Sequence, residues 1–196
     1  MRGVAVAVIV AGVGGLGYRL VVKGDLTVDT GLGRTVRPLG PLTVTIAAPR
    51  EIVFDVIAGP YLGRTPRAMT EEIDVLERGT DMVLAAHRTP VRTGLVATTV
   101  ETVRFTRPET IDFRLLRGPV PHVVERFTLG GDDDRTQLVY TGELGTDFWR
   151  AGRWWGEQVG RKWEATVRSS LDKVRVEAER RVRESGRGHL RDVGAR

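Results

Sequence analysis

Residues 147–184, DFWRAGRWWGEQVGRKWEATVRSSLDKVRVEAERRVRE, form the stretch around which the rest of the chain is organised. Its apolar side chains recur every three or four residues, the spacing of one broad face of an α-helix, and they are Trp155, Val159, Trp163, Val167, Leu171, Val174, Ala178 and Val182. Thr146 or Asp147 is a suitable N-cap, because a short side-chain oxygen accepts hydrogen bonds from the free N–H groups of the first turn. Gly186 is a suitable end. We therefore expect a long amphipathic helix near the end of the chain.

Three glycines, Gly152, Gly156 and Gly160, repeat every four residues within the apolar arc of this helix. A glycine in a helix interior costs about 1 kcal/mol relative to alanine, so the repeat needs a physical reason. One interpretation is close packing of the helix on a sheet. The other is that the missing side chains leave room for a ligand beside Trp155 and Trp163.

Upstream of the helix, short runs of alternating polarity end at turn-forming residues, as in consecutive β-strands. The runs are residues 42–46, 72–78, 82–88, 95–106, 110–117, 122–129 and 136–144. Pro49 begins a short helix that ends near Ala58, and residues 61–69 form a second short helix or a loop. Consecutive strands with short turns predict an antiparallel meander. The predicted fold class is α+β, with a curved antiparallel sheet wrapped around the long C-terminal helix.

The first 23 residues predict a single-pass transmembrane helix at the N-terminus. Residues 3–18 carry no charge, and counting through Val22 gives about 20 residues, the length that spans a bilayer core. More basic residues follow this run than precede it, so the positive-inside rule predicts a cell-membrane protein with a cytoplasmic globular part. A row of small residues at spacing four suggests a homodimer as a further hypothesis; the row is Gly3, Ala7, Ala11 and Gly15.

Two other interpretations of this N-terminal run compete with the anchor. A secretory signal peptide would have only Met1 and Arg2 as its basic region, and no good small-x-small cleavage site follows. Residues 12–17 also match G-x-G-x-x-G, the turn that brings a helix N-terminus to a dinucleotide. That fold needs a helix and a second parallel strand next, and only residues 18–23 stand before Gly24. A membrane anchor is therefore preferred.

The amino-acid composition excludes several kinds of functional site. The chain has no cysteine, which excludes disulfides and thiolate metal sites. Its net charge is +5, but acids are interleaved with the bases, so no nucleic-acid partner is predicted. His87, His122 and His189 are too dispersed for a metal site, and no cofactor is predicted. The predicted organisation is an anchor (1–23), a linker (24–41), a ligand-binding domain (42–184) and a basic tail (185–196).

Residues 44–57, VTIAAPREIVFDVI, form a strand, a turn and an alanine-proline helix start, and Arg117-Gly118-Pro119 forms a turn before a late strand. With the long terminal helix, this order of elements resembles the START/birch-allergen-type superfamily, also called SRPBCC, and within it the polyketide cyclase/dehydrase and lipid-transport group. The likeness covers residues 41–184. It implies a helix-grip fold with an apolar cavity between sheet and terminal helix. Members bind lipids, sterols, polyketides or other hydrophobic ligands, and some catalyse cyclisation or dehydration.

Strand alternation assigns side chains to the face toward that cavity. The residues expected to bind a ligand there are Phe113, Phe127, Tyr140, Trp155, Gly156, Val159, Gly160 and Trp163. Glu101 and Glu125 share the inward face, so they are the candidate catalytic residues; a wetted or arginine-paired carboxylate is the structural alternative. His122 follows Pro121 at a strand start, where a turn or rim position is expected, and His87 lies near a strand end. Trp154 falls outside the apolar stripe, near Arg150, and is expected to pack under the loop at residues 119–121, to meet lipid headgroups or to form a protein contact.

These observations lead to one predicted function and one alternative. The prediction is non-catalytic, membrane-tethered binding of a hydrophobic ligand, a lipid or polyketide-like molecule. The alternative is a polyketide aromatase/cyclase or dehydratase that uses a cavity carboxylate.

Overall fold

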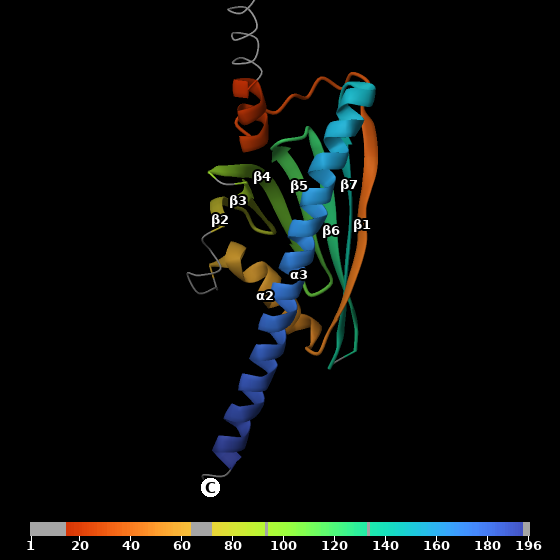
Figure 1. Ribbon diagram of the computed structural model, residues 1–196. Coiled ribbons are helices and arrows are strands. Elements are labelled where there is room, and N and C mark those ends of the chain that lie inside the picture. Colours follow the sequence, from red (N-terminus) through yellow and green to blue (C-terminus); the bar gives the residue numbers. More distant parts are fainter. Residues whose placement is uncertain (1–14, 64–71, 93, 133, 194–196) are drawn as a thin grey trace, which may run out of the picture.

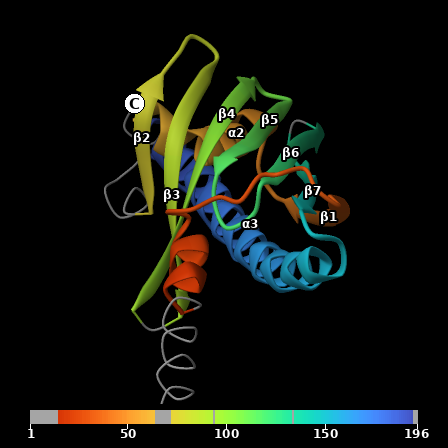
Figure 2. The same cartoon turned by 90° about the horizontal axis from the view of Figure 1, so that it is seen from above.

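A curved sheet and one long helix that crosses it make up most of the structure (Figures 1 and 2). The computed structural model describes residues 15–63, 72–92, 94–132 and 134–193. The strands in these ranges are β1 (Thr35–Ile46), β2 (Ile73–Arg78), β3 (Met82–Arg92), β4 (Leu95–Thr106), β5 (Thr110–Arg117), β6 (His122–Gly131) and β7 (Thr136–Thr146). The helices are α2 (Arg50–Leu62), α3 (Trp149–Val193) and a short helical segment at residues 15–23.

The sheet has the order β1-β7-β6-β5-β4-β3-β2, and every neighbouring pair is antiparallel. Strands β2 to β7 follow one another as a meander, and β1 pairs with β7 at the far edge, which confirms the α+β helix-grip prediction. Alternation gives the sheet one face toward α3 (Figure 2). On β5, for example, Ile111, Phe113 and Leu115 are buried in the core.

Helix α3 lies across the concave side of the sheet and then extends past it (Figure 1). Val167, Leu171 and Ala178 of the predicted stripe are buried, so the apolar face does pack inward. The predicted end at Gly186 is wrong, because α3 continues to Val193. Gly186 has open space around it rather than a capping turn. Ion pairs at helical spacing stabilise the part of α3 before it; they join Glu177 to Arg180 and Arg181, and Arg180 to Glu184.

The predicted linker is partly strand. β1 begins at Thr35, seven residues before the predicted start at Leu42, and the register with β7 shifts between Leu39 and Leu42. The two prolines in this stretch indicate an irregular tether when the sequence is considered alone. They are tolerated because β1 is an edge strand, where a missing N–H leaves no sheet partner unpaired.

Residues 24–34 run along the domain as a fixed strap. The Thr27 hydroxyl donates to the Gly118 carbonyl at 2.8 Å and accepts from the Gly118 N–H at 2.9 Å. The Asp147 carboxylate accepts from the backbone N–H groups of Thr30 and Gly31 at 2.7 and 2.8 Å, and from Arg34 Nε at 2.8 Å. Segments between 91 and 117 residues apart in sequence are thereby joined at one end of the molecule.

The predicted transmembrane helix falls largely on residues 1–14, which lie outside the described residues. Residues 15–23, its last part, are helical. Among the described residues, no helix is both long and apolar enough to cross a bilayer. Membrane anchorage and the cytoplasmic orientation therefore stay predictions.

Candidate functional site

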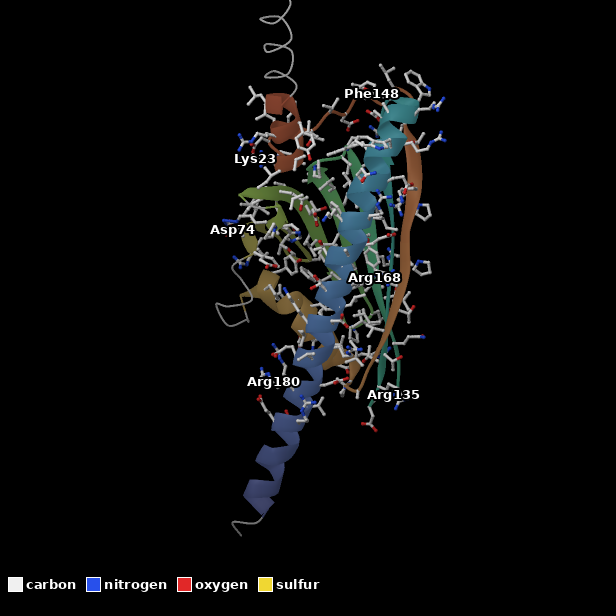
Figure 3. The ribbon with its side chains drawn as sticks, in the orientation of Figure 1. Lys23, Asp74, Arg135, Phe148, Arg168 and Arg180 are labelled. Carbon is white, nitrogen blue, oxygen red and sulfur yellow. The ribbon has the colours of Figure 1, made fainter. Side chains whose placement is uncertain are left out.

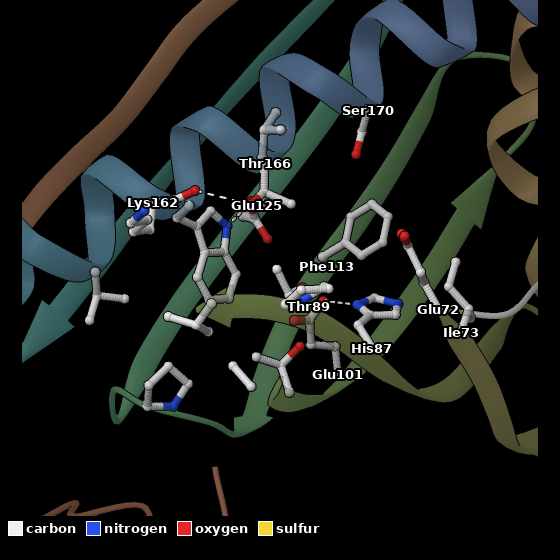
Figure 4. Close-up of a pocket in the computed structure, with 18 of the residues that line it drawn as sticks. Glu72, Ile73, His87, Thr89, Glu101, Phe113, Glu125, Lys162, Thr166 and Ser170 are labelled. Carbon is white, nitrogen blue, oxygen red and sulfur yellow. Dashed lines mark hydrogen bonds and ion pairs between the residues drawn. The ribbon is translucent and has the colours of Figure 1, made fainter. Parts of the chain in front are cut away.

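A cavity of about 870 Å³ lies between α3, α2 and the concave side of the sheet (Figure 4). Of the predicted ligand-binding residues, five line it; they are Phe113, Phe127, Trp155, Val159 and Trp163. Three do not line it, and they are Tyr140, Gly156 and Gly160. Glu101 and Glu125, the candidate catalytic residues, both line it. The cavity is therefore largely aromatic and aliphatic with a few polar groups, as in sites for small organic molecules.

Glu125 projects from β6 into the cavity and is 6% exposed. Its Oε1 accepts two hydrogen bonds, from the Tyr140 hydroxyl at 2.6 Å and from Trp163 Nε1–H at 2.7 Å. Gly142, directly opposite Glu125 on β7, has no side chain to crowd it: a Cβ there would lie 3.2 Å from the Glu125 Cγ. With both donors on Oε1, Oε2 is the oxygen left to exchange a proton with a bound molecule.

The environment of Glu125 favours its neutral form. Burial first, and the nearby charge of Glu101 second, raise the pKa of Glu125 to about 7, although the bonds from Tyr140 and Trp163 act in the opposite direction. Burial and the Glu125 charge also raise the pKa of Tyr140, so Tyr140 stays a phenol and a donor. Near neutral pH, Glu125 is therefore available both as an acid and as a base.

A second polar group stands on β3 and β4. His87 Nδ1 lies 3.1 Å from Glu101 Oε2, and His87 Nε2 lies 3.1 Å from the Tyr61 hydroxyl of α2 (Figure 4). Burial alone would lower the pKa of His87, but the charge and hydrogen bond of Glu101 outweigh it and raise that pKa. Burial alone would raise the pKa of Glu101, but His87, with a hydrogen bond from Thr99, lowers it. Each of the two groups therefore favours the charged form of the other.

Aromatic rings connect the two polar groups along the sheet. The Phe113 ring lies 6.4 Å from the His87 ring and 5.5 Å from the Phe127 ring, measured between centroids. Phe127 in turn lies 5.3 Å from Tyr140. A planar apolar molecule resting on Phe113 would thus have the His87–Glu101 pair at one side and Glu125 at the other.

The mouth of the cavity is more polar than its interior. Helix α3 lines it with Gln158, Lys162, Thr166, Ser170 and Lys173, three or four residues apart (Figure 4). Tyr18 and Val22 from residues 15–23 also line the cavity, and the Tyr18 ring meets the Trp155 ring edge to face at 6.1 Å. A ligand would therefore enter past hydrogen-bonding groups and a short apolar helix.

The predicted residues that do not line the cavity have structural positions. Tyr140 is fully buried behind Glu125, so it holds the carboxylate rather than a ligand. Gly156 and Gly160 lie against the sheet, because a Cβ at Gly156 would meet Thr146 and one at Gly160 would meet Arg37 of β1, whereas a Cβ at Gly152 would meet the Asp147 backbone. These glycines do not leave space for a ligand, because they face other parts of the protein rather than the cavity. They allow close packing of α3, which was the other interpretation.

The remaining predictions about polar and aromatic residues have mixed outcomes. Helical geometry predicts Trp154 outside the apolar stripe, and it is 64% exposed, but it also lines the rim of the cavity. His122 lies at the surface and pairs with Glu143 at 2.8 Å, whereas His87 lines the cavity from the middle of β3 rather than near a strand end. In the described ranges, no group of three or more His, Asp and Glu side chains could hold a metal ion.

Sequence reasoning misses two functional candidates and undervalues a third. The pattern predicts Tyr61 in a loop or second short helix, because Gly59-Pro60 resembles a helix end; α2 in fact continues through Pro60 to Leu62. Thr99 faces inward on the same side of β4 as Glu101, two residues away, so the alternation along β4 could have identified it. His87 on β3 contacts Glu101 on β4, and only the register between these two strands reveals that the two side chains are neighbours.

The fold and site can be compared with known proteins. No family model and no curated protein sequence matches the chain. Among solved structures, the ZhuI aromatase/cyclase from Streptomyces sp. R1128 is similar with a TM-score of 0.64 and 28% identity, covering 78% of this chain and 99% of that chain. A protein from Thermus thermophilus has a TM-score of 0.56 and 16% identity, covering 74% and 97%. The di-domain ARO/CYC protein BexL, from the BE-7585A biosynthetic pathway, has a TM-score of 0.52 and 17% identity, covering 75% and 49%.

These likenesses confirm the resemblance to the SRPBCC superfamily and its polyketide cyclase group. At 16% and 17% identity, the second and third structures bear on the fold alone.

Proposed function

From the helix-grip fold of the SRPBCC superfamily, we propose that the cavity binds a hydrophobic, polyketide-like small molecule. The observation that carries this proposal is the cavity of about 870 Å³ with an aromatic wall and a small number of convergent polar groups. Removing apolar ligand surface from water supplies the driving force, at roughly 25 cal/mol per Å². Glu125 and His87 would orient the oxygen atoms of the ligand, because both are polar side chains in the cavity lining.

Ligand binding can be tested by native mass spectrometry of the full chain after gentle extraction, followed by titration with planar aromatic ketones and with fatty acids. We expect a small molecule to co-purify and the ketones to bind. The variant Val159→Trp should block binding by filling the cavity. The matched control Val176→Trp, at an exposed position of the same helix, should not. A chain that binds no member of either panel, or a Val159→Trp variant that binds as well as the parent, would refute the proposal.

A second candidate function is acid–base catalysis on such a molecule, as an aromatase/cyclase or dehydratase. The observation that favours it is that Glu125, with a pKa near 7, and the His87–Glu101 pair stand on the same cavity wall. Cyclisation needs a base to remove a proton next to a carbonyl, and dehydration needs an acid to protonate the leaving hydroxyl. The similarity to ZhuI, which is named an aromatase/cyclase, adds to this candidate.

One experiment distinguishes a catalytic role of Glu125 from a role in ligand binding. With a poly-β-keto substrate, Glu125→Gln should lower kcat by about 100-fold or more, the usual contribution of a general acid or base. Its dissociation constant for a non-reacting planar ketone should change little, because glutamine keeps the acceptor for Tyr140 and Trp163. Equal kcat in the parent and in Glu125→Gln would exclude Glu125 as the catalytic group and leave the binding proposal standing.

A further inference from the structure

One end of the domain exposes an unusual set of apolar side chains. Most of the large apolar residues that are exposed in the described structure belong to residues 16–36 and 148–154; they are Leu16, Tyr18, Leu26, Val28, Leu32, Val36, Phe148, Trp149 and Trp154. The two segments are joined directly, because the Phe148 N–H donates to the Leu32 carbonyl at 2.7 Å and the Trp149 N–H donates to the Gly33 carbonyl at 3.0 Å. We call this set the aromatic end.

Phe148 and Trp149 are held outward by a strained backbone. Both have positive φ, 71° and 47°, a conformation that bulky side chains rarely adopt. The Trp149 ring occupies the place that a Cβ on Gly33 would take, at 2.2 Å, so only glycine fits beneath it. Phe148 is nevertheless 43% exposed and Trp149 61%. The contact with Gly33 covers only part of the Trp149 ring, and strain that leaves both rings this exposed points to a use for them.

The support beneath the aromatic end is rigid and internally neutralised. Asp147 precedes Phe148, is 4% exposed, and accepts from the strap residues Thr30, Gly31 and Arg34. These bonds hold the pKa of Asp147 well below its usual range, with the Arg34 bond as the largest cause. The carboxylate therefore fixes the strap and the start of α3 together without presenting its charge to the surface.

The charges left at this end are mainly basic. Arg150 and Arg153, next to the two aromatic residues, are exposed and make no ion pair with any residue in the described part of the chain. Arg19 and Lys23 are exposed on residues 15–23. Asp29 is paired with Arg34, and Glu157 with Arg37, which leaves Asp25 as an exposed acid on the strap. Aromatic rings flanked by arginines match the chemistry of an anionic lipid interface.

The position of this end relative to the chain also favours a lipid surface. The chain enters the described structure at residue 15, at the end of the molecule where α3 begins (Figures 1 and 3). The residues that precede it, 3–14, are uncharged and apolar in sequence. Tyr18 and Trp154, two members of the aromatic end, also line the cavity. A bilayer at this end would therefore lie beside both the apolar N-terminal sequence and the mouth of the cavity.

We propose that the aromatic end is a membrane-contacting face, on which Phe148 and Trp149 enter the interfacial region of an anionic bilayer and Arg150 and Arg153 meet the headgroups. This inference is independent of the ligand and of any catalysis in the cavity. It also differs from anchorage by the N-terminus, because it assigns lipid contact to the folded domain itself.

The test uses the full chain, which has no cysteine of its own. Phe148→Cys, Trp149→Cys and the control Val176→Cys each receive an environment-sensitive fluorophore; Val176 is 60% exposed and lies 27 residues along α3 from Trp149. Each labelled protein is mixed with phosphatidylcholine vesicles that contain about 30% phosphatidylglycerol, and binding is followed separately by co-sedimentation. Circular dichroism of the three variants checks that the fold is unchanged.

On bound vesicles, we expect blue-shifted and stronger emission from labels at positions 148 and 149, and emission typical of water at 176. Raising the salt to about 0.5 M, which shortens the Debye length well below 10 Å, should weaken the response. Three results would each overturn the proposal. They are a chain that does not bind vesicles, a bound chain whose labels at 148 and 149 remain in water, and a response that rises with protein concentration without vesicles, which would indicate contact between two copies.

Discussion

The pKa of Glu125 makes a stability prediction that glutamine substitution can isolate. In the folded protein this pKa is about 7, against an ordinary value of 4.5, so the native state holds the proton more tightly than the unfolded chain does. The free energy of unfolding must then fall as pH rises from about 4.5 to about 7, and remain lower above that window. Glu125→Gln keeps the acceptor for Tyr140 and Trp163 and has no proton to lose, so its free energy of unfolding should not show this fall with pH.

The size of the effect follows from the two pKa values. Each pKa unit corresponds to about 1.36 kcal/mol, so the ionised side chain costs the folded state roughly 3 kcal/mol at pH 8. Part of that cost is already present at pH 5, where the unfolded carboxyl is mostly ionised. Between pH 5 and pH 8, the stability of the parent relative to Glu125→Gln should therefore fall by roughly 2–3 kcal/mol.

His87 contributes a slope of its own in both proteins. Its pKa is raised, so its stabilisation is fully present below about 6.5 and is lost as pH rises through the folded value. The difference between the two proteins, rather than either curve alone, therefore reports on Glu125 together with its charge interactions with His87 and Glu101. Urea unfolding of each protein at half-unit pH steps, followed by tryptophan fluorescence, gives that difference. Glu109→Gln, at an exposed position, is the matched control and should track the parent.

Parallel pH curves for the parent and Glu125→Gln would refute the reasoning. They would mean that water or a conformational change hydrates the carboxylate, and that the cavity around Glu125 is not the low-dielectric site described above. A gap that opens in the opposite direction would mean that the charged form is the one the fold stabilises.

Three further predictions concern neighbouring features. Asp147→Asn should lower the free energy of unfolding by about 2–4 kcal/mol at neutral pH, because Arg34 loses its buried, charged hydrogen-bond acceptor. Because the pKa of Asp147 is lowered in the folded protein, this loss should shrink as pH falls below about 4, which acid titration of urea midpoints will show. Gly152→Ala should lower the free energy of unfolding by more than about 2 kcal/mol, because the new Cβ would lie 1.6 Å from the Asp147 carbonyl oxygen. Gly186→Ala is the control: its Cβ would lie in open space, so the free energy of unfolding should rise by up to about 1 kcal/mol in the same assay. Tyr140→Phe should raise the pKa of Glu125 above 7 by removing a hydrogen bond to its carboxylate, measurable by NMR titration of the side-chain carboxyl carbon.

Much of the fold was predictable because it rests on local patterns. Alternation placed Ile111 and Phe113 inward, and the same argument placed Glu101 and Glu125 on the cavity side. These predictions depend on the period of two along a strand, which short turns do not disturb. The helix stripe was equally clear, and its central residues are in the core.

The errors arose where tertiary contacts override local signals. Pro38 and Pro41 indicated a linker, but an edge strand accommodates them. The glycines of α3 follow the geometry of close approach to β1 and β7, which sequence spacing cannot separate from ligand space. The pairing of His87 with Glu101 depends on the β3–β4 register, and the strap from Thr27 to Arg34 depends on partners about a hundred residues away.

The charge state of the cavity connects its structure to its chemistry. Well below pH 7, Glu125 is neutral, and His87 and Glu101 each favour the charged form of the other, so this wall of the cavity suits a neutral molecule. Glutamine could fill the structural role of Glu125 toward Tyr140 and Trp163 without the penalty of roughly 3 kcal/mol at high pH. What glutamine cannot do is give or take a proton through Oε2. The packing of Glu125 therefore accounts for its position, and the proposed acid–base function would account for its being a carboxylic acid rather than an amide.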